Sequence, residues 1–119
     1  MTKGTSHRPE RLAGLIQEAV AAALTTSVKD PRIGFVTLTA VSLSADAKHA
    51  VVRVSVLGTE EEKTRALEGL DSARGFLRGH LARTLVLRSV PDLRFELDRG
   101  LEHAQRINQI LADLKRDES

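Results

Sequence analysis

The side chains best placed to do chemistry in this chain are two arginines within residues 73–78, Ala-Arg-Gly-Phe-Leu-Arg. An apolar stripe at helical spacing runs through this segment and consists of Leu67, Leu70, Leu77, Leu81 and Leu85. In one unbroken helix Arg74 would lie on that stripe, and burying its unpaired guanidinium would cost several kcal/mol. A break near Gly75 would rotate the second half of the helix and remove the conflict. We therefore predict a bend between two helices.

The predicted bend has the chemistry of a phosphate site. The first N–H groups of the new helix have no partner within that helix, and the helix dipole favours an anion there. Arg74 and Arg78 add positive charge, and Gly75 would let a ligand approach the backbone closely. We interpret the bend as a nucleic-acid contact. The alternative is a helix–turn–helix corner whose arginines are merely solvated.

Composition limits the classes of function. The 119 residues, 41% hydrophobic and 29% charged, suit one soluble domain with one core. The absence of cysteine excludes disulfides, zinc-thiolate sites and thiol nucleophiles. With three Phe and no Tyr or Trp, a sheet that stacks bases on aromatic platforms is disfavoured. The net charge is only +2, so nucleic-acid binding would depend on how the basic residues are distributed.

Signals for catalysis, metal binding and membranes are missing from the sequence. The four histidines, at positions 7, 49, 80 and 103, have no metal-ligand spacing, and we expect His80 to be buried and satisfied. No nucleophile–base pattern or Gly-rich nucleotide loop occurs, so a hydrolase or dehydratase is a minor alternative. We predict a cytoplasmic protein that is not an enzyme, has no cofactor and does not bind membranes.

Hydrophobic periodicity and turn residues predict seven elements in the order helix, strand, strand, helix, helix, strand, helix. In the first strand the apolar phase slips between Leu38 and Val41, which indicates a bulge or burial on both sides. The expected ranges are 9–27, 35–43, 50–56, 60–86 for the bent helix pair, 93–97, and about 104–114.

This order predicts an α+β fold. The first two strands are joined by a tight turn and should pair antiparallel, whereas two helices join the second and third strands and permit a parallel crossover. The result is a three-stranded mixed sheet with helices on one face and a polar outer face, the arrangement of a type II KH domain. We expect residues 1–7 to be a flexible N-terminus, 8–114 the KH-like domain, and 115–119 a short tail.

Three stretches of residues resemble the ribosome-binding factor A family. They are Val-Lys-Asp-Pro-Arg-Ile-Gly at 28–34, the bend at 73–78, and Leu-Arg-Ser-Val-Pro-Asp-Leu-Arg-Phe at 87–95. The spacing of residues 50–57 and 106–111 fits as well, so the resemblance covers nearly the whole chain. It implies a KH-like domain in which an Ala-x-Gly bend replaces the usual Gly-x-x-Gly loop.

The resemblance also implies a function. Proteins of this family bind the free 30S subunit and its 16S rRNA late in assembly, assist maturation of the 16S rRNA 5′ region, and are associated with growth in the cold. They are not enzymes. A monomer is expected, and the sequence leaves open whether a ribosome-associated GTPase drives release. The alternative function is a small α+β adaptor that binds protein through its sheet edge and does not contact RNA.

Eight residues form the candidate nucleic-acid site. The bend supplies four. The remaining four come from the second helix of the bent pair, the turn after that helix, and the loop after the first helix of the chain. For Arg83 a solvated helix face is the alternative, whereas Arg88 lies in the turn before the third strand. Lys29 and Arg32 would contribute only if their loop lay beside the bend, and we expect Asp30 to pair locally with Arg32. The full set is Ala73, Arg74, Gly75, Arg78, Arg83, Arg88, Lys29 and Arg32.

Overall fold

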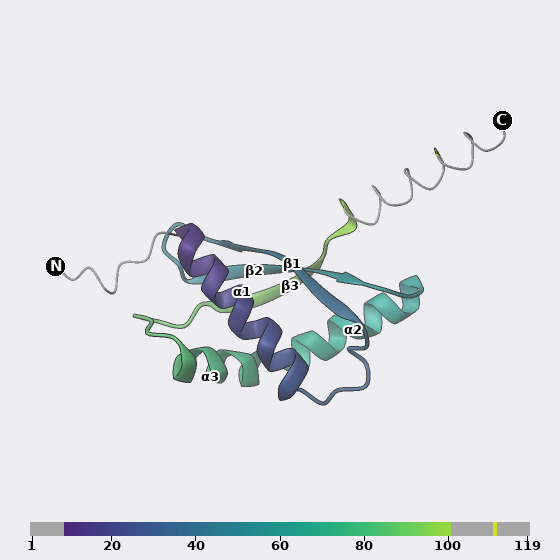
Figure 1. Cartoon of the computed structure of the whole chain (residues 1–119), viewed down its shortest axis with the longest axis horizontal. Helices are drawn as coiled ribbons and strands as arrows, with labels where there is room; N and C mark the ends of the chain where they lie inside the picture. Colours follow the sequence, from purple (N-terminus) through teal and green to yellow (C-terminus); the bar gives the residue numbers. More distant parts are fainter. Residues whose placement is uncertain (1–8, 101–110, 112–119) are drawn as a thin grey trace.

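The computed structural model describes residues 9–100 and residue 111. One three-stranded sheet is covered on one face by helices (Figure 1). The elements are α1 (Pro9–Thr26), β1 (Val36–Leu43), β2 (His49–Val56), α2 (Glu60–Ser72), α3 (Arg74–Thr84) and β3 (Asp92–Leu97). This confirms the predicted fold class and the order of elements through the third strand. The predicted helix near 104–114, except residue 111, and the two predicted termini lie outside the described residues.

The central strand of the sheet is β2. It pairs antiparallel with β1, from Val36 opposite Val56 to Leu43 opposite Ala50. It pairs parallel with β3, from His49 opposite Asp92 to Val54 opposite Leu97. The side chains of β2 alternate between buried and half-buried, as expected for a strand with one covered face. The mixed pairing confirms the predicted sheet.

The slip in the apolar phase of β1 is a β-bulge. Leu38 lies opposite Val54 and Ala40 opposite Arg53, so Thr39 is an extra residue in the pairing. The Thr39 hydroxyl donates to the Asp98 carboxylate, with an Oγ1–Oδ2 distance of 2.6 Å. Of the two alternatives that the sequence left open, a bulge or burial on both sides, the structure shows the bulge, and it links β1 to the residue that follows β3.

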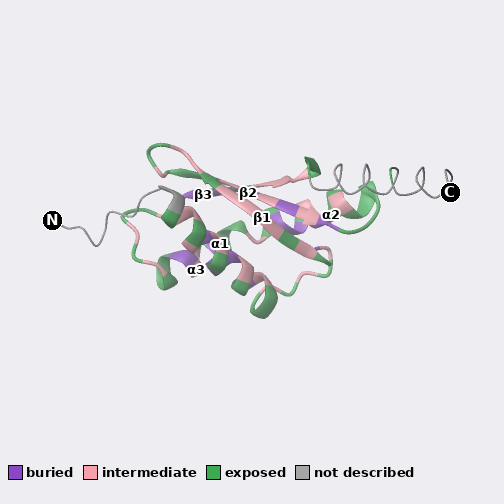
Figure 2. Cartoon of the chain, turned by 45° about the horizontal axis from the view of Figure 1, so that its top comes forward, coloured by how far each residue is buried: buried purple, intermediate pink, exposed green. Residues whose placement is uncertain are grey.

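The core lies between the sheet and the helices (Figure 2). The predicted leucine stripe faces it: Leu70, Leu77 and Leu81 are fully buried, while Leu67 and Leu85 pack against them as half-buried side chains. The outer face of the sheet is polar, with Arg94 exposed and paired with Glu96 at 3.3 Å. In the described part of the chain no helix has the length and hydrophobicity needed to span a bilayer.

The helix break lies at Ala73, the first residue of the predicted Ala-x-Gly bend and two residues before Gly75. Ala73 separates the two helices, with φ −85° and ψ −3°. Its N–H donates to the carbonyls of Gly69 and Leu70, and its own carbonyl accepts from Leu77 N at 2.9 Å. Because this one residue turns the second helix enough to remove Arg74 from the stripe, Gly75 can remain inside α3.

The helix α2 has a close contact with the loop 27–35 at Gly69. A Cβ at this buried glycine would lie 2.9 Å from Ile33 Cγ1 and 3.3 Å from Arg32 Cβ. Both neighbours are near the backbone of the loop and have little freedom to move. Gly69 is therefore needed for the loop to approach α2, a contact that the sequence pattern does not predict.

We predict that Gly69→Ala lowers the free energy of unfolding by about 1 kcal/mol, because overpacking against Ile33 should outweigh the gain in helix propensity. Urea denaturation measures the change. Gly14→Ala is the matched control: it adds the same methyl group to a helix at a position with nothing within 4 Å, and should stabilise the protein. Equal stabilisation by both variants would contradict the close contact.

Candidate nucleic-acid interface

The bend exposes the start of α3. Ala73 precedes this helix and offers no side-chain cap to its first N–H groups. Arg74, Gly75 and Phe76 follow in the first turn, and all three are exposed. A helix N-terminus without an internal side-chain cap suits an anion supplied by a ligand.

The two arginines of the bend bind the chain itself. Arg74 pairs with Asp71 at 3.1 Å and donates through Nη1 to the Leu93 carbonyl at 3.4 Å. Arg78 donates to the carbonyls of Pro91 and Val90, each at 3.2 Å. Each of the two arginine side chains remains 45% exposed. Arg74 thus connects the bend to β3, and Arg78 connects it to the segment before β3. Neither arginine is simply solvated.

Gly75 has no neighbour that explains the absence of a side chain. A Cβ built there meets nothing within 4 Å, although the residue lies inside a helix. Glycine costs about 0.5–1 kcal/mol relative to alanine in a helix interior and less in the first turn, where Gly75 lies. The free space leaves room for a ligand to approach the backbone.

The loop 27–35 lies beside the bend, a placement that the sequence left open. Val28, Lys29 and Asp30 line a cavity of 260 Å³ together with residues of the bend and the adjoining helix ends, Ser72, Ala73 and Phe76. Arg32 also donates to the Ser72 hydroxyl at 3.1 Å. Lys29 is exposed, and no ion pair of its side chain is found among the described residues. Lys29 thus brings an available positive charge to the bend.

Arg32 binds Asp30 within its own loop. Its Nη2 lies 2.7 Å from Asp30 Oδ2, and its backbone N–H donates to Asp30 Oδ1 at 2.9 Å. These bonds confirm the local pair predicted from the sequence. The hydrogen bonds from Arg32 lower the pKa of the Asp30 carboxyl, and the same pair raises the pKa of Arg32.

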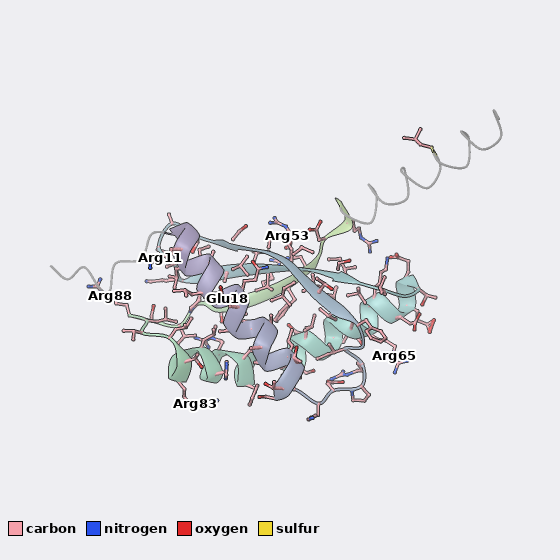
Figure 3. The ribbon with its side chains drawn as sticks, in the orientation of Figure 1. Arg11, Glu18, Arg53, Arg65, Arg83 and Arg88 are labelled. Carbon is pink, nitrogen blue, oxygen red and sulfur yellow. The ribbon has the colours of Figure 1, made fainter. Side chains whose placement is uncertain are left out.

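Arg83 and Arg88 lie away from the bend. Arg83 is in the last turn of α3, about 15 Å along the helix axis from Ala73 at about 1.5 Å per residue. Arg88 is in the loop between α3 and β3, at the same end of the molecule (Figure 3). Both are exposed. The structure therefore divides the eight predicted residues between the bend with its neighbouring loop and the far end of α3.

His80 is half-exposed on α3, and the prediction that it is buried is wrong. Its ring stacks on Phe76, with the ring centroids 6.5 Å apart, and its Nε2 lies 3.3 Å from the Thr84 hydroxyl. The side chain lies beside the leucine stripe instead of within it. Within the described ranges, no cluster of three or more His, Asp or Glu residues is arranged to hold a metal.

We predict that Gly75→Ala raises the free energy of unfolding by up to about 0.5 kcal/mol, because alanine favours the helix and the added methyl meets no atom. The same methyl would obstruct a phosphate at the bend, so nucleic-acid binding should weaken. Urea denaturation and an RNA-binding titration measure the two effects. Unchanged binding by the stabilised variant would show that no ligand approaches the backbone at Gly75.

The Asp30–Arg32 pair should make part of the stability depend on pH. Because the folded-state pKa of Asp30 is lowered, ionised Asp30 stabilises the fold at neutral pH. This contribution is lost as the pH falls through that pKa. We therefore expect the stability difference between the wild type and Asp30→Asn to shrink between about pH 6 and the acid range below about pH 4. A constant difference in urea denaturation across this range would contradict the pair.

Comparisons with proteins of known sequence match this architecture to one family. A family model described as ribosome-binding factor A matches residues 8–111. The protein of that name from Carboxydothermus hydrogenoformans is 46% identical over 112 residues, covering 94% of this chain and 90% of that protein. The one from Thermomicrobium roseum is 43% identical over 118 residues, covering 96% and 92%.

Solved structures give the same match. The crystal structure of ribosome-binding factor A from Thermus thermophilus is similar with a TM-score of 0.68 at 31% identity, covering 76% of this chain and 94% of that one. A Thermus thermophilus homology model fitted into the cryo-EM map of a 30S complex has a TM-score of 0.64 at 32% identity, with coverage of 76% and 96%. Fold, sequence and coverage agree, and this chain belongs to the ribosome-binding factor A family.

Proposed function

We propose that this protein binds the free small ribosomal subunit by contacting 16S rRNA with the bend at 73–78 and the adjoining loop 27–35. Family membership carries the proposal, supported by the similar Thermus chain that was fitted into a map of a 30S complex. The open space at Gly75 and the position of Lys29 support the choice of surface.

The geometry suits a phosphate backbone better than a base edge. The start of α3 offers N–H groups and a positive dipole, Lys29 adds a charge, and Arg74 and Arg78 present their exposed sides. Such contacts fix position and orientation but carry little sequence information. The proposed surface therefore docks on a folded segment of rRNA whose shape places phosphates at the bend.

We further propose that binding assists late assembly and maturation of the 16S rRNA 5′ region without catalysis. A factor that binds one rRNA conformation more tightly than another shifts the population toward it by the difference in affinity. No reacting group is needed for this effect. Purified immature subunits, with and without the protein, would show whether chemical probing of the 5′ region changes on binding.

Lys29 gives a cleaner test of the surface than the two arginines of the bend. Changing Arg74 or Arg78 to glutamate would also remove hydrogen bonds to the backbone of residues 90–93, so lost binding could reflect lost structure. Lys29 can be reversed in charge without breaking any ion pair in the described part of the chain. Arg53 is a matched control because it lies on the face of the sheet that the helices do not cover, away from the bend (Figure 3).

We predict that Lys29→Glu weakens co-sedimentation with purified 30S subunits by about ten-fold, whereas Arg53→Glu leaves it unchanged. Loss of one phosphate contact should also reduce the slope of log affinity against log salt by about 0.7–0.9. If Lys29→Glu and Arg53→Glu both bind 30S subunits as well as the wild type does, the loop 27–35 is not part of the contact surface. Association that survives high salt and nuclease treatment would instead favour the protein-binding adaptor.

A further inference from the structure

Two of the three phenylalanines are on the surface, near the loop 27–35. Phe76 is 45% exposed and lines the cavity beside the bend, whereas Phe35 is 81% exposed. Only Phe95 packs against the core. The low aromatic content argued against base stacking, yet most of the few aromatic rings lie on the side that carries the proposed RNA contact.

Local backbone geometry directs Phe35 outward. Gly34 has a φ of +59°, a left-handed conformation that few other residues adopt easily. Across this residue the chain changes from Ile33, which is 8% exposed in the core, to the exposed Phe35. The Phe35 carbonyl accepts from Leu57 N at 3.4 Å, which attaches the residue to the sheet. The backbone of Phe35 is therefore attached to the sheet while its ring remains exposed to solvent.

Positive charge lies beside the Phe35 ring. Arg65 and Arg32 line a cavity of 300 Å³ that also includes Phe35. Arg32 is paired with Asp30, whereas Arg65 points outward from α2 (Figure 3). The acidic residue of this cavity is Glu62, whose carboxylate accepts from the Thr59 N–H at 2.8 Å in a capping box. An exposed aromatic ring near the Arg65 cation suits a nucleotide, because the base can stack while its phosphate meets the charge.

This cavity continues the proposed contact surface. Residues 28–30 of the loop line the cavity at the bend, and residues 31–35 line the cavity at Phe35. One short loop therefore joins the two positions. A strand of RNA whose phosphates contact the bend would reach Phe35 by following this loop.

We propose that Phe35 is a stacking platform for an unpaired base of the rRNA, with Arg65 at a neighbouring phosphate. This inference rests on the proposed function and adds a base contact to a surface that otherwise binds phosphates. It assigns Phe35 a role that depends on its aromatic ring and not on its hydrophobicity alone.

A series of substitutions at Phe35 separates these two properties. Phe35→Leu keeps an apolar side chain without a ring, and Phe35→Trp keeps a ring. We expect the leucine variant to bind 30S subunits about ten-fold more weakly and the tryptophan variant to bind at least as well as the wild type. Because the ring is exposed, urea denaturation should give the same stability for all three proteins.

The tryptophan variant adds a direct readout, since the chain has no natural tryptophan. Its fluorescence should be quenched when protein-free 16S rRNA binds, as expected for an indole stacked on a base. Arg65→Gln should weaken binding and reduce the salt dependence without abolishing the quenching.

Three results would overturn the inference. In the first, the Phe35→Leu variant binds the subunit as tightly as the wild type. In the second, the fluorescence of the Phe35→Trp variant does not change when rRNA binds. In the third, the Phe35→Ala variant loses affinity for the subunit but the Phe35→Leu variant does not. The third result would indicate an apolar contact with protein. If the wild type binds subunits and only the Phe35 effects are missing, the inference fails alone. If the wild type binds neither subunits nor rRNA, the proposed function fails.

Discussion

The fold depends on keeping one arginine out of the core of a helix pair. Leu70, Leu77 and Leu81 must all face the sheet, but continuous helical geometry would place Arg74 among them. Ala73, between the two helices, resolves this conflict by turning α3 relative to α2. The freed Arg74 then donates to the Leu93 carbonyl, so the charge that interrupts the helix also helps to hold β3 in place.

A second constraint brings the candidate site together. Gly69 lacks the side chain that would push Ile33 and Arg32 away, so the loop 27–35 lies against the end of α2. The Asp30–Arg32 pair shapes that loop, and the bond from Arg32 to Ser72, 40 residues further along the chain, attaches it near the bend. Two distant segments thus form one surface. Packing and hydrogen bonds within the chain hold the two segments together.

The basic residues of this surface differ in how far they are committed to the fold. Arg32, Arg74 and Arg78 each bind carboxylates or backbone carbonyls of the chain, which limits the charge they can offer a ligand. Lys29 is exposed and has no ion pair in the described residues. Counting arginines in a sequence therefore overestimates the positive charge available to RNA. The small net charge of +2 makes this distinction important for binding.

Local patterns were enough to predict the helices and strands through β3, the mixed sheet, an irregularity near Thr39, the leucine stripe and the Asp30–Arg32 pair. Each follows from periodicity or from residues close together in the chain, which local physical rules can evaluate. The same patterns located the bend at residues 73–75 but placed His80 too deep, because its burial depends on how far Ala73 rotates the second helix. The folded chain was needed to show that Gly69 admits the loop 27–35, that Lys29 lies at the bend, and that Arg78 binds the carbonyls before β3. These contacts join segments distant in the chain, and their partners are set by packing that no local pattern encodes.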